Sequence, residues 1–320
     1  MALKLTQRIE KETGFLPVEK IGFIYNLSTT LLILILYDRM AHPDPMLLGR
    51  FLILVGTWAL FYLYDKRPNR LTLFLRIAFQ LALLAYWYPD TYEFNRLFPN
   101  LDHLFARAEW AIFGCQPAIT FSQSMPSYWV SEAFNLGYFS YYPMILTVIL
   151  FYFFKQPRMT EKVTFIIISA FYFYYVIYIF LPVAGPQFYF PVVGDTQVAS
   201  GIFPALHDYF NLHAQLQSCP SDHNGLFKTL VELSQAAGER PTAAFPSSHV
   251  GISTVVMILA YRYSRTHRLF FWLLPLYLLL CGATVYIQAH YVIDVIAGLI
   301  TAFIFYAIAR KSYDYYVEGK

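Results

Sequence analysis

Two short stretches of the chain place a histidine beside groups that could handle a phosphate. In "HYVID", His290 and Asp294 are four residues apart, so they share one face of a helix. A carboxylate one turn away can accept a hydrogen bond from one imidazole nitrogen, which leaves the other nitrogen free and more basic. A charge at a membrane boundary is costly without a partner, which favours a functional pair. A structural anchor for the helix end is the alternative.

The second stretch, "FPSSHVG", is typical of a helix start that could bind an anion. Pro246 suits the first helical turn, where its missing N–H costs nothing. Ser247 and Ser248 lie beside the free N–H groups of that turn, and a helix start of this kind attracts phosphate. His249 projects from the same turn. An ordinary helix cap with an interfacial histidine is the alternative interpretation.

Together, the two stretches suit nucleophilic attack on phosphorus. His290 would be the nucleophile, Asp294 would orient it, and His249 would protonate the leaving oxygen. Arg240, just before the second stretch, would add positive charge at the phosphate. An exposed loop arginine explains Arg240 equally well. This mechanism requires no metal, and we expect no cofactor.

The composition is that of a polytopic membrane protein. Of the 320 residues, 58% are hydrophobic and 13% are charged, whereas soluble domains have about 25% charged residues. Several apolar runs have the length of about 20 residues that a helix needs to cross the hydrocarbon core. Tyr and Trp cluster at the ends of these runs, as at membrane interfaces. The net charge of +3 does not indicate nucleic-acid binding, and no cleavable signal peptide is evident.

We therefore expect an all-α fold, a bundle of about eight transmembrane helices forming a single membrane domain. The expected spans are residues 21–37, 46–64, 71–88, 136–154, 163–182, 246–261, 269–287 and 291–309. Basic residues gather in the loops at one end, which the positive-inside rule assigns to the cytoplasm together with both termini. His249 and His290 open spans six and eight from the other end. The site should therefore face the periplasm or a lumen.

The two stretches resemble a known enzyme family. "PSSH", followed about forty residues later by "HYVID", is similar to the paired blocks of the type 2 phosphatidic acid phosphatase superfamily. The resemblance is good over residues 240–300, and "LDHLFARAEWAIFGCQP" (101–117) looks like the inositol phosphorylceramide synthase branch. It implies a six-helix phosphatase-like core within residues 136–310, extra N-terminal spans at 21–64 and an outer loop at 183–245.

The resemblance also implies roles for individual residues. His290 would form a phosphohistidine, Asp294 would support it, and His249 would be the acid and base. The residues expected to bind phosphate and substrate are Ser247, Ser248, Arg240, Gly251 and Tyr291. The chain departs from the phosphatase branch at Thr284, where that branch has Arg, and it lacks the Lys-x6-Arg-Pro block of that branch.

The favoured function is phosphoryl-group transfer on a lipid, with a slight preference for an alcohol over water as acceptor. An inositol phosphorylceramide synthase would move inositol phosphate from phosphatidylinositol to a ceramide-type lipid. A lipid phosphate phosphatase acting on phosphatidic acid shares the first half-reaction and stays open. A proton-coupled transporter or lipid-binding protein would spread its ionisable residues through the membrane, whereas these lie at one boundary. A soluble-type haloperoxidase relative does not fit the number of spans.

The remaining polar candidates are in the outer loops. Cys115 and Cys219 both fall there, where a disulfide can form, and Cys281 is expected to be inert packing within a span. Asp222 and His223 could join the histidines in a metal site, but no recognised ligand spacing is present.

Overall fold

The protein is described by a computed structural model, which covers residues 9, 13–213, 216, 225–264, 266–317 and 319. Every element in this part of the chain is a helix, and several helices are long and apolar enough to cross a membrane. The predicted all-α fold and polytopic helical membrane bundle are confirmed.

The described residues form fourteen α-helices and two short 3₁₀ helices. In chain order they are α1 (Pro17–Leu36), η1 (Tyr37–Arg39), α2 (Pro43–Lys66), α3 (Arg70–Asn95), α4 (Asp102–Phe113), α5 (Pro117–Ser124), α6 (Tyr128–Phe139), α7 (Tyr141–Lys155), α8 (Pro157–Phe180), α9 (Pro186–Val193), α10 (Asp195–Ala199), η2 (Tyr209–Asn211), α11 (Leu226–Gly238), α12 (Ser248–Arg262), α13 (Arg268–Tyr286) and α14 (Val292–Val317).

Six of the described helices are long and apolar enough to span a membrane: α1, α2, α3, α8, α13 and α14. Helices α6 and α7 are bent by 45° relative to each other and make a seventh span if they are counted as one. The expected span at 246–261 differs from the structure, because α12 has only 15 residues. A helix of that length is about 22 Å long, shorter than the hydrocarbon core of about 30 Å.

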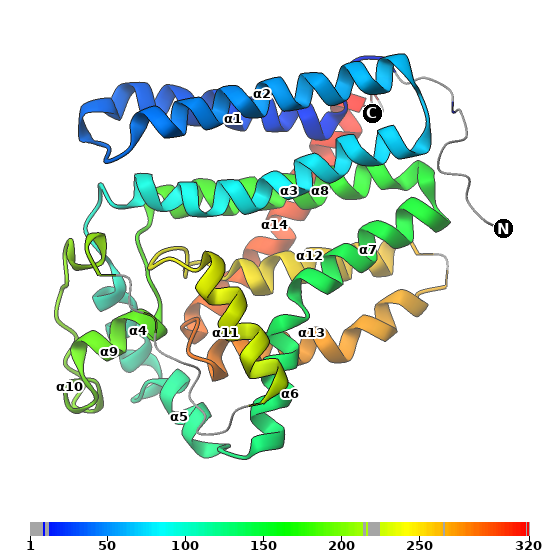
Figure 1. The fold of residues 1–320 in the computed structure, drawn as a ribbon. Coiled ribbons are helices and arrows are strands. Elements are labelled where there is room, and N and C mark those ends of the chain that lie inside the picture. Colours follow the sequence, from blue (N-terminus) through cyan, green and yellow to red (C-terminus); the bar gives the residue numbers. More distant parts are fainter. Residues whose placement is uncertain are drawn as a thin grey trace.

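Helix α12 lies inside the bundle. It packs against α7, α8, α13 and α14, and most of its side chains are buried. Figure 1 shows α1 and α2 together along one edge, α3 and α8 beside them, and the short helices α4, α5, α9 and α10 gathered beyond one end of the bundle. The same end holds the start of α12.

Buried ion pairs join the first three spans. Arg50 of α2 pairs with Asp90 of α3 at 2.7 Å, and Arg76 of α3 pairs with Glu19 of α1 at 2.5 Å. All four side chains are nearly inaccessible to solvent. A charge at membrane depth is expensive without a partner, so these pairs fix how α1, α2 and α3 face one another.

The starts of α12 and α14 are in direct contact. The backbone N–H of Ser247 donates to the carbonyl oxygen of Asp294 at 3.0 Å. A Cβ atom at Gly298 would collide with the carbonyl oxygen of Ser247, so only glycine permits this approach. The contact brings two segments that are about forty residues apart in the sequence to one place at the end of the bundle.

Candidate active site

The two histidines predicted from the sequence meet in the structure. Nδ1 of His249, in the first turn of α12, lies 3.3 Å from Nε2 of His290, in the connection between α13 and α14. The rings of Tyr138 and Tyr141 flank His249, with centroids 4.6 Å and 4.5 Å from its ring. Only 4% of His290 is exposed. The pair is therefore enclosed by aromatic walls.

His290 is held by a backbone carbonyl. Its Nδ1 lies 2.8 Å from the carbonyl oxygen of Ala244, while Oδ2 of Asp294 is 3.6 Å from the same nitrogen. A carbonyl can only accept, so Nδ1 carries the proton and Nε2 keeps its lone pair. Asp294 is fully buried, and its Oδ2 instead accepts the N–H of Tyr291 at 2.9 Å. The hydrogen bond expected from His290 to the Asp294 carboxylate is thus replaced by a hydrogen bond from His290 to the carbonyl of Ala244.

The surroundings of His290 keep it uncharged. Burial lowers the pKa of His290 to about 4, while the Ala244 carbonyl and the Glu239 carboxylate act in the opposite direction. At neutral pH the imidazole is therefore neutral, and the lone pair on Nε2 faces Nδ1 of His249. An imidazole in this state can act as a nucleophile.

Glu239 was not among the residues singled out in the sequence. Its carboxylate is close enough to His290 for an electrostatic interaction, and it accepts a hydrogen bond from the hydroxyl of Tyr88 at 3.2 Å. Burial raises the pKa of Glu239, and a protonated His290 opposes that rise. A single acidic residue in a loop gives no signal by itself. The sequence offered only its position beside Arg240.

Most backbone N–H groups at the start of α12 already donate hydrogen bonds within the protein. Ser247 is fully buried, and its Oγ accepts the N–H of Val250 at 3.3 Å as an N-cap. The N–H of Ser248 donates to the hydroxyl of Tyr178 at 3.0 Å. Among the described residues, the backbone N–H of His249 has no acceptor. Of the N–H groups expected to bind an anion here, those of Ser248 and Val250 are therefore bonded to the protein instead.

The other predicted substrate-binding residues, Gly251, Tyr291 and Arg240, have different environments near the histidine pair. A Cβ at Gly251 would collide with the hydroxyl of Tyr174, so Gly251 allows α12 and α8 to pack closely. Tyr291 follows His290 directly and is fully buried. Arg240 is half-buried and donates from Nη1 to the carbonyl of Glu239 at 2.9 Å. No described hydrogen bond or ion pair joins Arg240 to either histidine.

Two carboxylates from α4 bind the chain directly after His290. Asp102 accepts the hydroxyl of Tyr291 at 3.0 Å, and Glu109 accepts the N–H groups of Val292 and Ile293 through Oε1. Burial raises the pKa of both acids, that of Glu109 to about 7 with a further contribution from the Asp294 charge. In the sequence, residues 101–117 stand out only through their family resemblance. A seven-residue spacing of acids, two helical turns, was the available signal.

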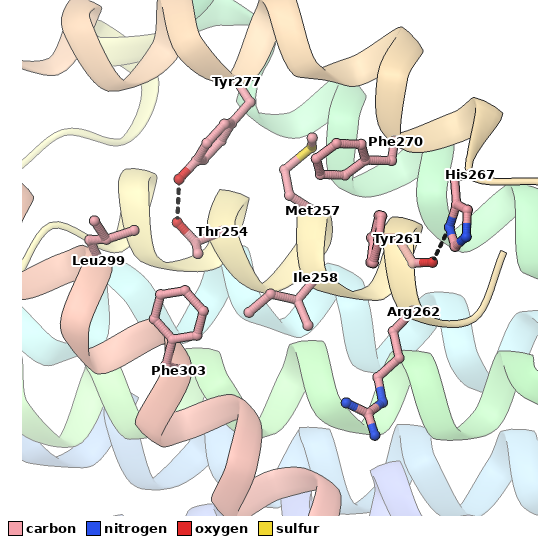
Figure 2. Close-up of a pocket in the computed structure, with 10 residues that line it drawn as sticks. All are labelled: Thr254, Met257, Ile258, Tyr261, Arg262, His267, Phe270, Tyr277, Leu299 and Phe303. Atoms are coloured by element: carbon pink, nitrogen blue, oxygen red, sulfur yellow. Dashed lines mark hydrogen bonds between the residues drawn. The ribbon is translucent and has the colours of Figure 1, made fainter.

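A groove of about 560 Å³ lies on another side of α12 (Figure 2). Its lining comes from α12, α13 and α14 and includes Met257, Ile258 and Phe303. Thr254 bonds to the hydroxyl of Tyr277 at 2.9 Å at one end. At about 100° per residue, Thr254 points about 140° away from His249 around the helix. The groove is therefore separate from the histidine pair.

Two expectations concern residues outside the described part of the chain. Cys219, the proposed disulfide partner of Cys115, lies there, and so do Asp222 and His223 of the metal alternative. Within the described residues, no group of three or more His, Cys, Asp or Glu side chains could hold a metal ion.

Comparisons with known proteins identify one family. The sequence model of the PAP2 superfamily, the type 2 phosphatidic acid phosphatase superfamily, matches residues 103–308. This range contains both histidine stretches and nearly all of α4. No match is found among curated proteins or among solved structures.

Proposed function

The chain belongs to the PAP2 superfamily, and on that premise we propose that it transfers a phosphoryl group of a membrane lipid through a phosphohistidine at His290. Membership makes it a membrane enzyme of the phosphatase or phosphotransferase type. The observation that carries the more specific proposal is the histidine pair, with Nδ1 of His249 at 3.3 Å from Nε2 of His290.

In the first step, Nε2 of His290 attacks phosphorus. A nitrogen–phosphorus bond forms, the bond from phosphorus to the lipid alcohol breaks, and protonated His249 gives its proton to the leaving oxygen. Bound phosphate favours the protonated form of His249, because an opposite charge nearby stabilises it. The proton stays on Nδ1 of His290, and its hydrogen bond to the Ala244 carbonyl stabilises the positive charge that develops on the ring.

In the second step, an acceptor hydroxyl attacks the phosphohistidine. His249 takes the proton of that hydroxyl, a new oxygen–phosphorus bond forms, and the bond from phosphorus to Nε2 of His290 breaks. The enzyme returns to its starting state. Water as acceptor gives a phosphatase, and a lipid alcohol gives a transferase.

We favour a phosphodiester donor and an alcohol acceptor, as in an inositol phosphorylceramide synthase that uses phosphatidylinositol and a ceramide-type lipid. Glu239 supports this choice, because its carboxyl group interacts electrostatically with His290 and, when ionised, opposes negative charge at the phosphorus. A phosphodiester carries one negative charge, whereas a phosphate monoester carries about 1.5 to 2 at neutral pH. Thr284 also supports it, since the phosphatase branch has Arg there and the buried Thr284 hydroxyl only bonds the carbonyl of Cys281 at 2.9 Å.

The test uses the purified protein in vesicles with two sets of labelled lipid. One set holds phosphatidylinositol and ceramide, and the other holds phosphatidic acid. Inositol phosphate on ceramide supports the transferase, and inorganic phosphate from phosphatidic acid alone selects the phosphatase instead. Turnover that persists in His290→Ala, or a quenched reaction without phosphate on His290, contradicts the phosphohistidine.

We also propose that the histidine end faces the periplasm or a lumen and that both termini are cytoplasmic. The support is the gathering of basic residues in the loops at the other end of the bundle, including Lys66, Arg70, Arg158 and Arg268. In a variant whose three native cysteines are replaced by serine, a membrane-impermeant thiol reagent should label a cysteine placed at exposed Leu212 in intact cells, and not one placed at Arg158. The reverse labelling pattern contradicts this orientation.

A further inference from the structure

We propose that Asp102 and Glu109 of helix α4 are positioning residues that hold His290 for attack on phosphorus. The inference rests on the proposed role of His290 as nucleophile. It assigns a task to α4, a helix that is too short to span the membrane and lies beyond the end of the bundle (Figure 1). Neither acid contacts the histidine rings in any described hydrogen bond. Glu109 acts through the chain after His290, and Asp102 acts through Tyr291 and through the turn at Gly185.

The Glu109 carboxylate accepts hydrogen bonds from the first two backbone N–H groups of α14. Its Oε1 accepts from the backbone nitrogen of Val292 in a short hydrogen bond and from that of Ile293 at 3.4 Å. A helix cannot satisfy its first N–H groups internally, and a carboxylate at that end also interacts favourably with the helix dipole. Glu109 is fully buried, and its Oε2 has no partner among the described residues. A buried acid so placed fixes where α14 begins, two residues after His290.

Asp102 holds the residue next to His290 and the turn that packs on it. Its carboxylate accepts the Tyr291 hydroxyl at 3.0 Å and the N–H groups of Ala184 and Gly185 at 2.6 Å and 2.8 Å. Gly185 has φ +94, and a Cβ there would lie 2.6 Å from the carbonyl oxygen of Ala289. The same carboxylate therefore orders both the residue after His290 and the turn that presses on the residue before it.

The two acids act as one clamp because they lie two turns apart on α4. Residues seven apart share a helix face, and this face of α4 turns toward the start of α14. His290 itself is anchored through its backbone N–H to the carbonyl of Thr284 at 3.0 Å and through Nδ1 to Ala244. Neither anchor controls the chain on the C-terminal side of His290, where Tyr291 and Val292 are held by α4. A displacement of about 1 Å at a reacting group can cost about 10²-fold in rate.

The central experiment compares Glu109→Ala with Glu109→Gln. Alanine removes the acceptor for both N–H groups, whereas glutamine keeps a carbonyl oxygen there. We expect kcat for lipid phosphoryl transfer to fall about 10- to 100-fold in Glu109→Ala with KM changed less than about twofold. Glu109→Gln should recover most of the lost kcat. Tyr291→Phe, which removes only the hydroxyl bound by Asp102, should lower kcat by a smaller factor and fold normally.

A matched control separates positioning from general stability. Glu132 of α6 accepts the N–H groups of Phe227 and Lys228 at 2.9 Å and 3.0 Å, so it caps α11 as Glu109 caps α14. Glu132→Ala should lower the melting temperature about as much as Glu109→Ala does and leave kcat unchanged. Equal kcat losses in the two alanine variants, or no recovery in Glu109→Gln together with an unaffected Tyr291→Phe, overturn the clamp.

The failure of the proposed function has a different signature. In that case the wild-type protein lacks turnover on every lipid phosphate tested, or His290→Ala retains it. The clamp fails alone when the wild type is active and His290→Ala is inactive while Glu109→Ala keeps the kcat of the wild type.

Discussion

Helices α12 and α14 carry the two histidine stretches, yet they begin in different ways. Helix α12 is capped by Ser247, the residue directly before it, whose Oγ accepts the N–H of Val250. Helix α14 receives its cap from Glu109, which precedes Val292 by 183 residues. A local neutral cap contributes about 1 kcal/mol. A buried carboxylate left without its partners costs more, about 1–3 kcal/mol or above.

The difference shows how the two histidines are controlled. His249 lies within a helix turn that its own sequence builds and that Ser247 caps locally. His290 lies outside any helix, and its place depends on Ala244, before α12, and on Glu109 and Asp102 of α4, which come from two other segments. The position of His290, the proposed nucleophile, should therefore be the more sensitive of the two to substitutions elsewhere in the protein.

The largest expected effect comes from the histidines themselves. His290→Ala should lower lipid phosphoryl transfer by about 10⁴-fold or more, because both half-reactions pass through its Nε2. His249→Ala should reduce it by about 10²- to 10⁴-fold, the usual range for a general acid and base. Both are measured as initial rates in vesicles, with circular dichroism to establish folding. A His249→Ala loss larger than that of His290→Ala would assign the nucleophile to α12.

The contact between the two helix starts should be the next most sensitive point. Gly298→Ala places a Cβ against the Ser247 carbonyl and should destabilise the protein by about 1–3 kcal/mol, the usual cost of overpacking. It should also lower kcat, since it moves α14 relative to α12. Gly238→Ala is the control, because a Cβ there meets nothing within 4 Å. Melting temperature and kcat are measured together, and equal values for both variants would contradict the tight contact.

The pH dependence of stability should distinguish the two caps. The pKa of Glu109 is about 7 in the folded protein and 4.5 when free, so the folded state binds more protons between these values. Stability from this group is therefore present at low pH and is lost as pH rises from about 4.5 to about 7. Asp294 is the charged group that faces Glu109 and adds to the effect.

Glu109→Gln should remove the loss of stability between pH 4.5 and 7, because glutamine does not titrate. His290 acts in the opposite direction, because burial lowers its pKa to about 4 and stability falls as pH drops from 6.5 toward that value. The difference in melting temperature between wild type and Glu109→Gln, followed from pH 4.5 to 7, cancels the His290 contribution. A constant difference over this window would show that Glu109 does not titrate there.

The smallest effect is expected at the local cap of α12. Ser247→Ala removes the Oγ that accepts the Val250 N–H and should cost about 1 kcal/mol of stability. Its kcat should fall by less than that of Glu109→Ala, because the backbone N–H of Ser247 still bonds the Asp294 carbonyl. Ser247→Thr, which keeps a hydroxyl, should restore the melting temperature. A larger kcat loss in Ser247→Ala than in Glu109→Ala would reverse the comparison.

The sequence by itself determined the bundle and the two chemical stretches. Its apolar runs predicted the long spans, because a helix across lipid needs about 20 apolar residues wherever it occurs. The cap at Ser247 and the pairing of His249 with His290 followed from short-range rules and the family resemblance. The predicted span at 246–261 differs from the structure. This apolar run has the composition of a span, but it forms the short helix α12, which is buried among other helices.

Only the tertiary structure decided what holds His290. The acceptor for Nδ1 is the carbonyl of Ala244, and every residue has such a carbonyl, so no sequence pattern marks it. Glu109 and Asp102 are single acids far from His290 in the chain, and their task depends on how α4 folds over the start of α14. Side-chain type and local spacing can be read from the sequence, whereas a contact between distant segments depends on the packing of the whole bundle.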